Sequence, residues 1–417
     1  MKSALFIALK LIRSPSNKTS IASPAIKIGT IAVGLGIMVM ILTVSIIRGF
    51  KHQITFKLKT LTSDVVVMPY HNEQDITSQP LTISPDTLQI IQKLPSIDKI
   101  EPVCLKNGIL KIKEENEGIV FKGVTHQYHW AILQPFLISG TWPNYTDTAI
   151  SKDIVISKKL ADKLHIHLHQ KLIIYFITKT KDEYQHEKLD YRSKDFYVTA
   201  IIHPQMSELD NQLIFGDARI IQKINNWKNN EYSQLEIYAK KDITSADIIE
   251  QLIDWLPYNY KLLSAEELYS NIFNWLALID VNAVIIIVLM LLVAAVNMVS
   301  ALIILILEKV TLIGILKALG MNNLSIKNIF LFISLKILIQ GLFIGNFLTL
   351  LILILQYHFH IFTLNPDAYY MDYIPVEWNF TDWFLLNVGT TITCLISMFI
   401  PTYLISHMAP AQILRWE

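Results

Sequence analysis

Three histidines alternate along one short stretch of the chain, at His165, His167 and His169. On a β-strand, where successive side chains point to opposite faces, this spacing would place three imidazoles on one face, and imidazole nitrogen is a common zinc ligand. However, the stretch follows a helical pattern and precedes a strand that we expect to start near Lys171. These neighbours favour a turn and leave a metal site as the alternative.

Motifs for catalysis and nucleotide binding are absent from the sequence. No glycine is followed by lysine, which excludes the phosphate-binding loop GxxxxGK[ST], and neither a GxSxG elbow nor an HExxH pair occurs. The apolar segments also lack the acid and base pairs that a proton-coupled transporter uses. We therefore expect a chain that is not an enzyme and binds no cofactor of its own. If ATP drives the protein, a partner polypeptide hydrolyses it.

Polar and small side chains inside apolar runs are the next candidates. Asn282 and Asn297 each place an amide where hydrocarbon is expected, and an interhelical hydrogen bond there contributes about 0.6–2 kcal/mol. We interpret both as helix-packing residues, with a substrate contact as the alternative. Gly341 and Gly345 have the small-xxx-small spacing that permits close helix approach.

The elements that must position these residues are four apolar runs. Hydrophobic residues make up 52% of the chain, whereas 36 basic and 35 acidic residues nearly balance, which argues against nucleic acid as a partner. Each run has about 20 residues or more, enough to cross about 30 Å of hydrocarbon. The first is retained as a span rather than cleaved as a signal peptide, because no small-x-small cleavage site precedes Arg48. The runs cover residues 28–47, 279–307, 337–355 and 383–405.

Charge in the short loops predicts the topology. The segment 1–27 carries five basic residues and no acidic one, whereas the loop 356–382 carries four acidic residues and no basic one. By the positive-inside rule, both termini (1–27 and 406–417) and the loop 308–336 are cytoplasmic. Within the first segment, residues 3–13 read as a basic amphipathic helix on the inner leaflet, or as a simple positive anchor. Four basic residues run against the rule, but they lead into a long segment that translocates regardless of charge: Arg48, Lys51, Lys57 and Lys59.

Residues 48–278 form the outer domain, and their pattern is of the α+β class. Short β-rich runs at 64–69, 108–113, 118–124, 171–178 and 196–202 alternate with helical patterns at 85–94 and 157–164. Ser157 is a plausible N-cap of the second helical pattern. The sequence therefore predicts a membrane protein of four transmembrane α-helices, arranged one plus three, with a large extracytoplasmic α+β domain, of one or two subdomains, inserted after the first.

The cytoplasmic loop contains a short helical pattern. Ile313, Leu316 and Leu319 recur at helical spacing, and Gly320 followed by two asparagines is a natural helix stop. Such a helix rests on lipid or fits a groove in a soluble partner. Periodicity alone favours lipid.

Several segments together resemble a known family. They are 272–275 continuing through Gly320, the runs 121–124 and 154–158, Tyr369-Tyr370, Pro375-Val376 and the tail 410–417. With the one-plus-three arrangement, they resemble the MacB/FtsX-like ABC transporter permeases, and within them the LolC/LolE lipoprotein-releasing permeases of the kind found in Bacteroidetes. The resemblance covers nearly the whole chain. Where the family often has an arginine-glutamate pair before the coupling glycine, this chain has Thr311-Leu312.

The resemblance implies mechanotransmission in a Gram-negative inner membrane. Two permease subunits, identical or paralogous, pair above a LolD-like ATPase dimer, and a triacylated lipoprotein passes from the membrane lipid to a LolA-like periplasmic chaperone. The apolar residues Ile46, Ile47, Phe50 and Leu276 are candidates for the acyl path between the first two spans. The resemblance overturns the lipid preference and implies an ATPase-coupling helix made of Leu312, Ile313, Gly314, Ile315, Leu316, Lys317, Ala318, Leu319 and Gly320.

Two other functions remain open at this point. A MacB-like efflux permease would export a peptide or drug, although MacB itself fuses the ATPase to the permease. An FtsX-like regulator would relay ATPase motion to a cell-wall hydrolase, although its outer domain tends to be smaller.

Overall fold

The computed structural model describes residues 22–70, 79–112, 114–181, 187–206, 210–241 and 243–402. The chain divides into two compact units. The membrane unit comprises residues 1–52, 275–363 and 373–417, and the outer unit comprises residues 53–274 and 364–372. The amphipathic helix expected at 3–13, Lys113 and the tail 406–417 lie outside the described residues.

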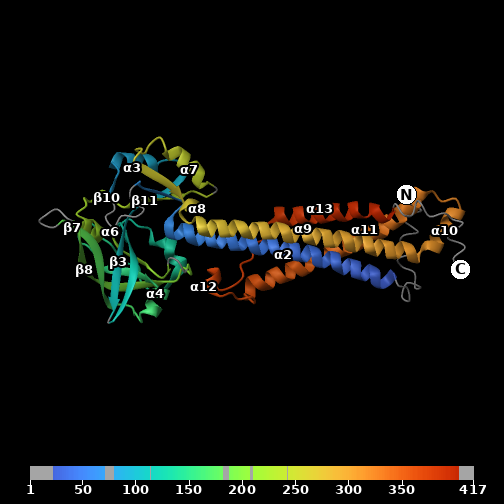
Figure 1. Ribbon diagram of the computed structural model, residues 1–417, viewed down its shortest axis with the longest axis horizontal. Coiled ribbons are helices and arrows are strands. Elements are labelled where there is room, and N and C mark those ends of the chain that lie inside the picture. The colour runs from blue at the N-terminus through green and yellow to red at the C-terminus, as the bar shows by residue number, and fades with distance from the viewer. Residues whose placement is uncertain are drawn as a thin grey trace. The chain divides into compact units, whose positions relative to one another are not determined.

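Four helices within the described ranges are long and apolar enough to cross a membrane, one before the outer domain and three after it. This confirms the predicted fold class. In Figure 1 their membrane-unit portions run side by side, and α9 is coloured yellow to orange. The four helices are α2 (Ala22–Thr62), α9 (Ser270–Glu308), α11 (Asn323–Phe359) and α13 (Phe380–Ser397).

The first two helices are longer than their apolar runs. Helix α2 continues from the run at 28–47 to Thr62, so its last ten residues belong to the outer unit. Ile54, Leu58 and Leu61 recur at helical spacing there and are all buried, which explains why the helix persists beyond the apolar run. Likewise α9 begins at Ser270, before the run at 279–307.

The outer unit is built on one ten-stranded mixed sheet, in the order β12-β1-β11-β3-β4-β9-β6-β8-β5, with β7 pairing with β3 and β8. A separate two-stranded sheet pairs β10 with β2. Strand β1 directly follows α2, and β12 is followed by the short helix α8 and then by α9. Strands β1 and β12 pair antiparallel from Val65↔Ser264 to Pro69↔Tyr260. The strands are β1 (Val65–Pro69), β2 (Leu81–Thr82), β3 (Ile97–Ile112), β4 (Glu115–Val124), β5 (Leu137–Gly140), β6 (Asp153–Ser157), β7 (Lys171–Lys181), β8 (Glu187–Ile202), β9 (Leu213–Asp217), β10 (Glu231–Tyr232), β11 (Gln234–Ala239) and β12 (Tyr260–Ser264).

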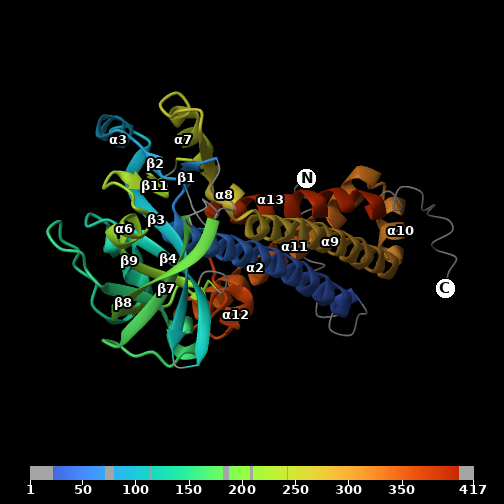
Figure 2. The same cartoon turned by 60° about the vertical axis from the view of Figure 1, so that its left-hand side comes forward.

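Two hydrophobic clusters share this sheet, although residues 53–274 form part of one compact unit. One lies around β1 and β11 with α3 and α7, and the other lies around β3, β4, β6, β7 and β8 with α4 and α6. Figure 2 shows α3 and α7 over one end of the sheet. The short helices of the chain are α3 (Pro85–Gln92), η2 (Trp130–Phe136), α4 (Lys158–Lys163), α6 (Ala218–Asn225), α7 (Ser245–Leu252), α8 (Ala265–Leu268), α10 (Val310–Ala318) and α12 (Pro366–Tyr369).

Local signals explain several boundaries in the outer unit. The Ser157 side chain accepts a hydrogen bond from the Leu160 amide, which confirms the predicted N-cap of α4. The alternating histidines lie in a turn, as expected, because His165 and His169 both have positive φ angles of 52° and 62°. Strand β3 is much longer than the run at 108–113 that predicts it, because it pairs in turn with β11, β4 and β7.

Candidate functional site

The short helix α10 lies between α9 and α11, two residues earlier at each end than the 312–320 segment that the sequence predicts. It ends at Ala318, and Gly320, which follows the C-cap Leu319, has a φ of 81°. The Gly320 amide donates to the Lys317 carbonyl (3.0 Å) and the Met321 amide to the Leu316 carbonyl (2.9 Å). These two bonds form a Schellman motif, which requires the positive φ that glycine adopts without strain. The helix stop expected at Gly320 is confirmed.

The two faces of α10 differ in burial. Ile313 and Gly314 are buried, and Ile313 belongs to the same apolar cluster as Ile306 and Ile326 of the adjoining long helices. On the opposite face, the exposed fraction is 47% for Ile315 and 79% for Leu319. Thr311 and Ala318 are also exposed, and after the turn Leu324 is 66% exposed. One face of α10 therefore holds the helix to the membrane unit, and the other presents apolar side chains.

The four acyl-path candidates lie near the points where α2 and α9 pass between the membrane unit and the outer unit, and α2 itself continues to Thr62. Phe50 and Leu276 are buried within the chain, whereas Ile46 and Ile47 are half-buried. The Phe50 ring packs edge-on against Trp275 of α9, with ring centroids 5.5 Å apart. In this conformation the region is packed rather than open.

Ion pairs join α2 to α13 and α9 in the same region. Arg48 of α2 pairs with Asp382 of α13 at 2.7 Å, and Lys51 of α2 pairs with Asp280 of α9 at 2.5 Å. Because all four side chains are partly exposed, each pair contributes at most about 1 kcal/mol. The pairs give Arg48 and Lys51 an acidic partner each.

The predicted packing residues occupy different surroundings. Gly341 and Gly345 of α11 lie against α2, where Gly34 supplies a third glycine that lies outside the small-xxx-small pair. A Cβ at Gly341 would come within 2.9 Å of the Thr30 carbonyl oxygen. By contrast, Asn282 is exposed and Asn297 half-buried on α9, and neither amide forms a hydrogen bond with another described residue.

An amide network that the sequence analysis missed joins α11 to α13. The Asn346 Nδ2 donates to Asn387 Oδ1 at 2.7 Å, and the Trp383 indole donates to Asn346 Oδ1 at 2.6 Å. The signal was present as two more asparagines in apolar runs. What could not be read from one sequence is that these two face each other while Asn282 and Asn297 do not.

A buried ion pair in the outer unit contacts the C-terminal end of α2. Lys122 of β4 pairs with Glu236 of β11 at 2.7 Å, and the two side chains are 3% and 2% exposed. The Lys122 ammonium also donates to the Leu61 carbonyl at 2.7 Å, where a cation favourably meets the negative end of a helix dipole. Next to this cap, Lys59 pairs with Asp64 at 2.8 Å. The segment 121–124, which carries part of the family resemblance, thus anchors the first helix.

Burial perturbs the acids around this pair. Desolvation raises the pKa of Glu101, which accepts a hydrogen bond from the His129 amide, to about 7. Desolvation also raises the pKa of Glu236, opposed by the Lys122 charge. These groups are buried in the sheet rather than in a cleft, so their shifts indicate a structural network and not an acid–base centre.

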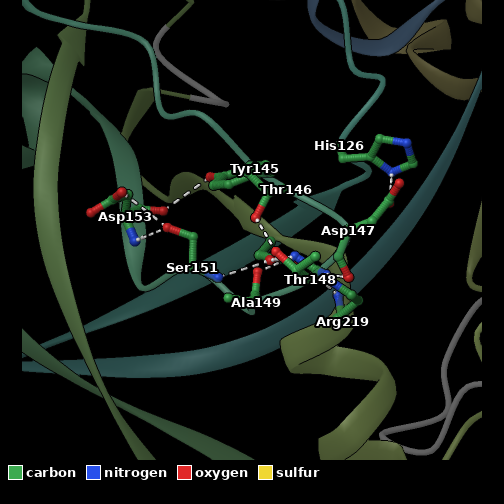
Figure 3. Close-up of polar contacts among 10 residues, drawn as sticks. His126, Tyr145, Thr146, Asp147, Thr148, Ala149, Ser151, Asp153 and Arg219 are labelled. Atoms are coloured by element: carbon green, nitrogen blue, oxygen red, sulfur yellow. Dashed lines mark hydrogen bonds and ion pairs between the residues drawn. The ribbon is translucent and has the colours of Figure 1, made fainter.

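A second polar cluster shapes the surface loop between β5 and β6 (Figure 3). The Arg219 guanidinium donates to both carboxylate oxygens of Asp217 and to the carbonyls of Asp147 and Ala149. The Ser151 amide donates to Asp217 at 3.1 Å. Arg219 and Asp217 thus bond to the backbone of residues 147, 149 and 151, so the cluster fastens the loop to the start of α6. Across the described part of the chain, no group of three His, Cys, Asp or Glu side chains could hold a metal ion.

These features define a class: a multi-pass membrane protein whose first and second spans lead into neighbouring strands of one outer sheet. Residues 29–254 match the MacB-like periplasmic core domain, and residues 284–410 match the FtsX-like permease C-terminal region. The chain belongs to this family of ABC transporter permeases.

Relatives match along the full chain. The lipoprotein-releasing system transmembrane protein LolE of Haemophilus influenzae is 21% identical over 434 residues, covering 99% of both chains. The corresponding protein LolC of Buchnera aphidicola is 22% identical over 419 residues, covering 99% of this chain and 98% of its own. Among solved structures, the periplasmic region of MacB from Actinobacillus actinomycetemcomitans aligns with a TM-score of 0.33 and 11% identity, covering 50% of this chain and 92% of that one.

Proposed function

We propose that this chain is the permease subunit of an ATP-driven mechanotransmission transporter that releases outer-membrane-destined lipoproteins to a periplasmic chaperone. The observation that carries the proposal is the match to lipoprotein-releasing permeases over 99% of the chain, outer domain and spans together. In this proposal the protein lies in the inner membrane with both termini in the cytoplasm. It binds no cofactor and performs no catalysis itself.

The ATPase partner docks on α10. Ile315, Leu319 and Leu324 give the cytoplasmic turn an exposed apolar surface, which a groove in a soluble partner would cover. The opposite face, with Ile313 buried in the membrane unit, would pass the motion of that partner to α9 and α11. Lipid would cover the same apolar face, so the preference for a protein partner rests on the match of residues 284–410 to the FtsX-like permease region.

A second permease subunit covers α9. Only 11% of the most apolar window of α9 is buried in this chain, compared with 39% for α2. The Asn282 and Asn297 amides on α9 lack partners within the described residues, and an amide in hydrocarbon gains about 0.6–2 kcal/mol from an interhelical hydrogen bond. Both facts favour a protein neighbour, whether an identical subunit or a paralogue.

The lipoprotein enters from the outer leaflet beside α2 and α9, with its acyl chains along Ile46, Ile47, Phe50 and Leu276. Exposing an acyl chain to water costs about 0.8 kcal/mol per CH₂, which explains why ATP and an acceptor chaperone are needed. Because Phe50 and Leu276 are buried here, α2 and α9 must separate at these residues before the acyl chains can pass.

The test reconstitutes the full chain with its cognate ATPase and a labelled lipoprotein in liposomes, adds the periplasmic acceptor, and measures ATP-dependent release. Leu319→Glu places a charge on the exposed face of α10 and is expected to abolish release and co-purification of the ATPase. Ile253→Glu is the matched control, since Ile253 is a similarly exposed aliphatic residue of the outer unit, 61% exposed. Gly314 is less suitable for this test because it is buried.

Release by wild type and by Ile253→Glu, but not by Leu319→Glu, is the expected pattern. ATP hydrolysis by an assembled complex that releases no lipoprotein would contradict the substrate and leave efflux or hydrolase control as the function. Full release by Leu319→Glu would contradict docking on α10.

A further inference from the structure

The loop between α11 and α13 contains a segment that belongs to the outer unit. Leu364 to Asp372 cluster with residues 53–274, although the chain on either side belongs to the membrane unit. The segment contains α12, whose N-cap Asn365 accepts a hydrogen bond from the Asp367 amide. Figures 1 and 2 both show α12 beside the sheet of the outer unit. Met371 is only 2% exposed and serves as its apolar anchor.

One buried ammonium fastens this segment to the outer unit. Lys57, on the last turns of α2, donates to the Tyr370 carbonyl and to Gln205 Oε1, both at 2.7 Å, and is 8% exposed. Gln205 in turn donates through Nε2 to Asp372 Oδ2. Three segments far apart in sequence therefore meet at one charge. Because a buried cation must keep its hydrogen-bond partners, the docked segment is strongly favoured.

The same loop is held stiffly to α11 within the membrane unit. Gln356, in the last turn of α11 and 3% exposed, donates to the Phe362 and Ile374 carbonyls and accepts from the Phe362 amide at 2.9 Å. Ile374 donates to the Phe362 carbonyl at 3.0 Å, and Thr363 bridges to Tyr373. The chain entering the outer-unit segment, at Phe362, and the chain leaving it, at Ile374, are thus both hydrogen-bonded to the Gln356 side chain.

The two ends of the segment 364–372 are also joined to each other, next to the Thr363–Tyr373 bridge. The Leu364 amide donates to the Asp372 carbonyl at 2.8 Å, so the ends of the segment are joined by a hydrogen bond. Along the two arms of the loop, from the residues bonded to Gln356 to the residues bonded to Lys57, hydrogen bonds or a β-bridge join residues 362–374, 363–373 and 364–372. The hydrogen bonds between the two arms of the loop therefore follow one another along the chain, from the Ile374–Phe362 pair to the Leu364–Asp372 pair.

We propose that residues 364–372 form a strap that conveys movement of α11 to the outer domain, with Lys57 and Gln356 as its two positioning residues. The proposal rests on the proposed function, and adds a route that bypasses the direct continuation of α2 and α9 into the sheet. A loop that merely stabilises the fold would lower ATP hydrolysis, release and thermal stability together. A strap, when cut, leaves ATP hydrolysis running without release.

The experiment measures lipoprotein released per ATP hydrolysed by the full chain with its ATPase in liposomes. Lys57→Met and Gln356→Leu are expected to lower this ratio by about 5–150-fold, the range of typical coupling between sites, with the rate of ATP hydrolysis unchanged. Lys106→Met is the matched control. Lys106 is 7% exposed and donates to the Asn225 amide oxygen at 2.7 Å, so it loses an equivalent buried bond away from the strap.

Reattachment provides the rescue. In the Lys57→Met chain, with both native cysteines replaced by alanine, Gln205→Cys and Asp372→Cys are joined by a short thiol-reactive cross-linker, since the replaced side chains meet in a hydrogen bond. Cross-linking is expected to restore the ratio, and cleaving the linker to lower it again.

Severed variants that keep the wild-type ratio would overturn the strap, as would a completed cross-link that restores nothing. A parallel fall of ATP hydrolysis, release and melting temperature would also overturn it, in favour of a structural loop. If wild type itself hydrolyses ATP but releases no lipoprotein, that result contradicts the proposed function, and the strap, which rests on that function, is overturned as well.

Discussion

Replacing Gly345 by alanine tests the close approach of α2 and α11. A Cβ built at Gly345 would overlap the Ile37 Cγ2 atom and the Gly34 carbonyl oxygen. The Gly34 atoms are backbone and cannot rotate away, and Ile37 is fully buried. The two helices must therefore move apart along the segment where Gly34, Gly341 and Gly345 now meet.

The expected magnitude is the difference of two effects. Overpacking a close interface destabilises by about 1–3 kcal/mol, and backbone overlap belongs at the upper end of that range. Alanine in a helix is favoured over glycine by about 1 kcal/mol. Gly345→Ala is thus expected to lower the free energy of unfolding by about 2 kcal/mol.

Gly389 of α13 supplies the matched control, because a Cβ there would meet nothing within 4 Å. Gly389→Ala should gain only the helix-propensity term and stabilise the protein by up to about 1 kcal/mol. The assay is reversible unfolding of the full chain in detergent, with both variants measured in parallel. A Gly345→Ala chain as stable as Gly389→Ala would refute the close packing of α2 against α11.

Three further changes have defined outcomes. Lys122→Met leaves Glu236 as an unpaired buried charge and should destabilise by about 3–5 kcal/mol, whereas adding Glu236→Leu should recover most of that loss in thermal unfolding. Because burial raises the pKa of Glu101 from 4.5 to about 7, the folded state holds this proton more tightly than the unfolded state. The resulting stability, up to about 3 kcal/mol, is present below the unfolded pKa and is lost as the pH rises through about 7, and melting curves of Glu101→Gln should lack that slope. Asn387→Leu removes the partner of Asn346 and should destabilise the membrane unit by about 1 kcal/mol in detergent unfolding.

Each of the three has a contrary result. A double Lys122 and Glu236 variant no more stable than the single one would show that the pair is not coupled. A pH slope that survives in Glu101→Gln would assign it to other buried acids. An Asn387→Leu chain as stable as wild type would show that the amide network contributes nothing.

Much of the architecture follows from the sequence alone. Apolar runs of 20 residues have few alternatives to crossing a membrane, so the one-plus-three arrangement of spans is encoded locally. Local chemistry also determined the Ser157 cap and the Gly320 stop, since the Ser157 hydroxyl accepts from the amide three residues further on and Gly320 adopts its positive φ within one turn of chain. These features required no knowledge of distant residues.

Other features were decided only by the tertiary structure. Lys57 and Lys122 read as ordinary basic residues in a polar domain, and the structure buries both against carbonyls and side chains far away in the sequence. Among asparagines in apolar runs, Asn346 found a partner in Asn387, whereas Asn282 did not find one among the described residues. The physical reason is the same throughout: hydrophobic periodicity and capping depend on neighbours within a few positions, whereas the pairing of buried polar groups depends on which distant segments the packed fold brings together.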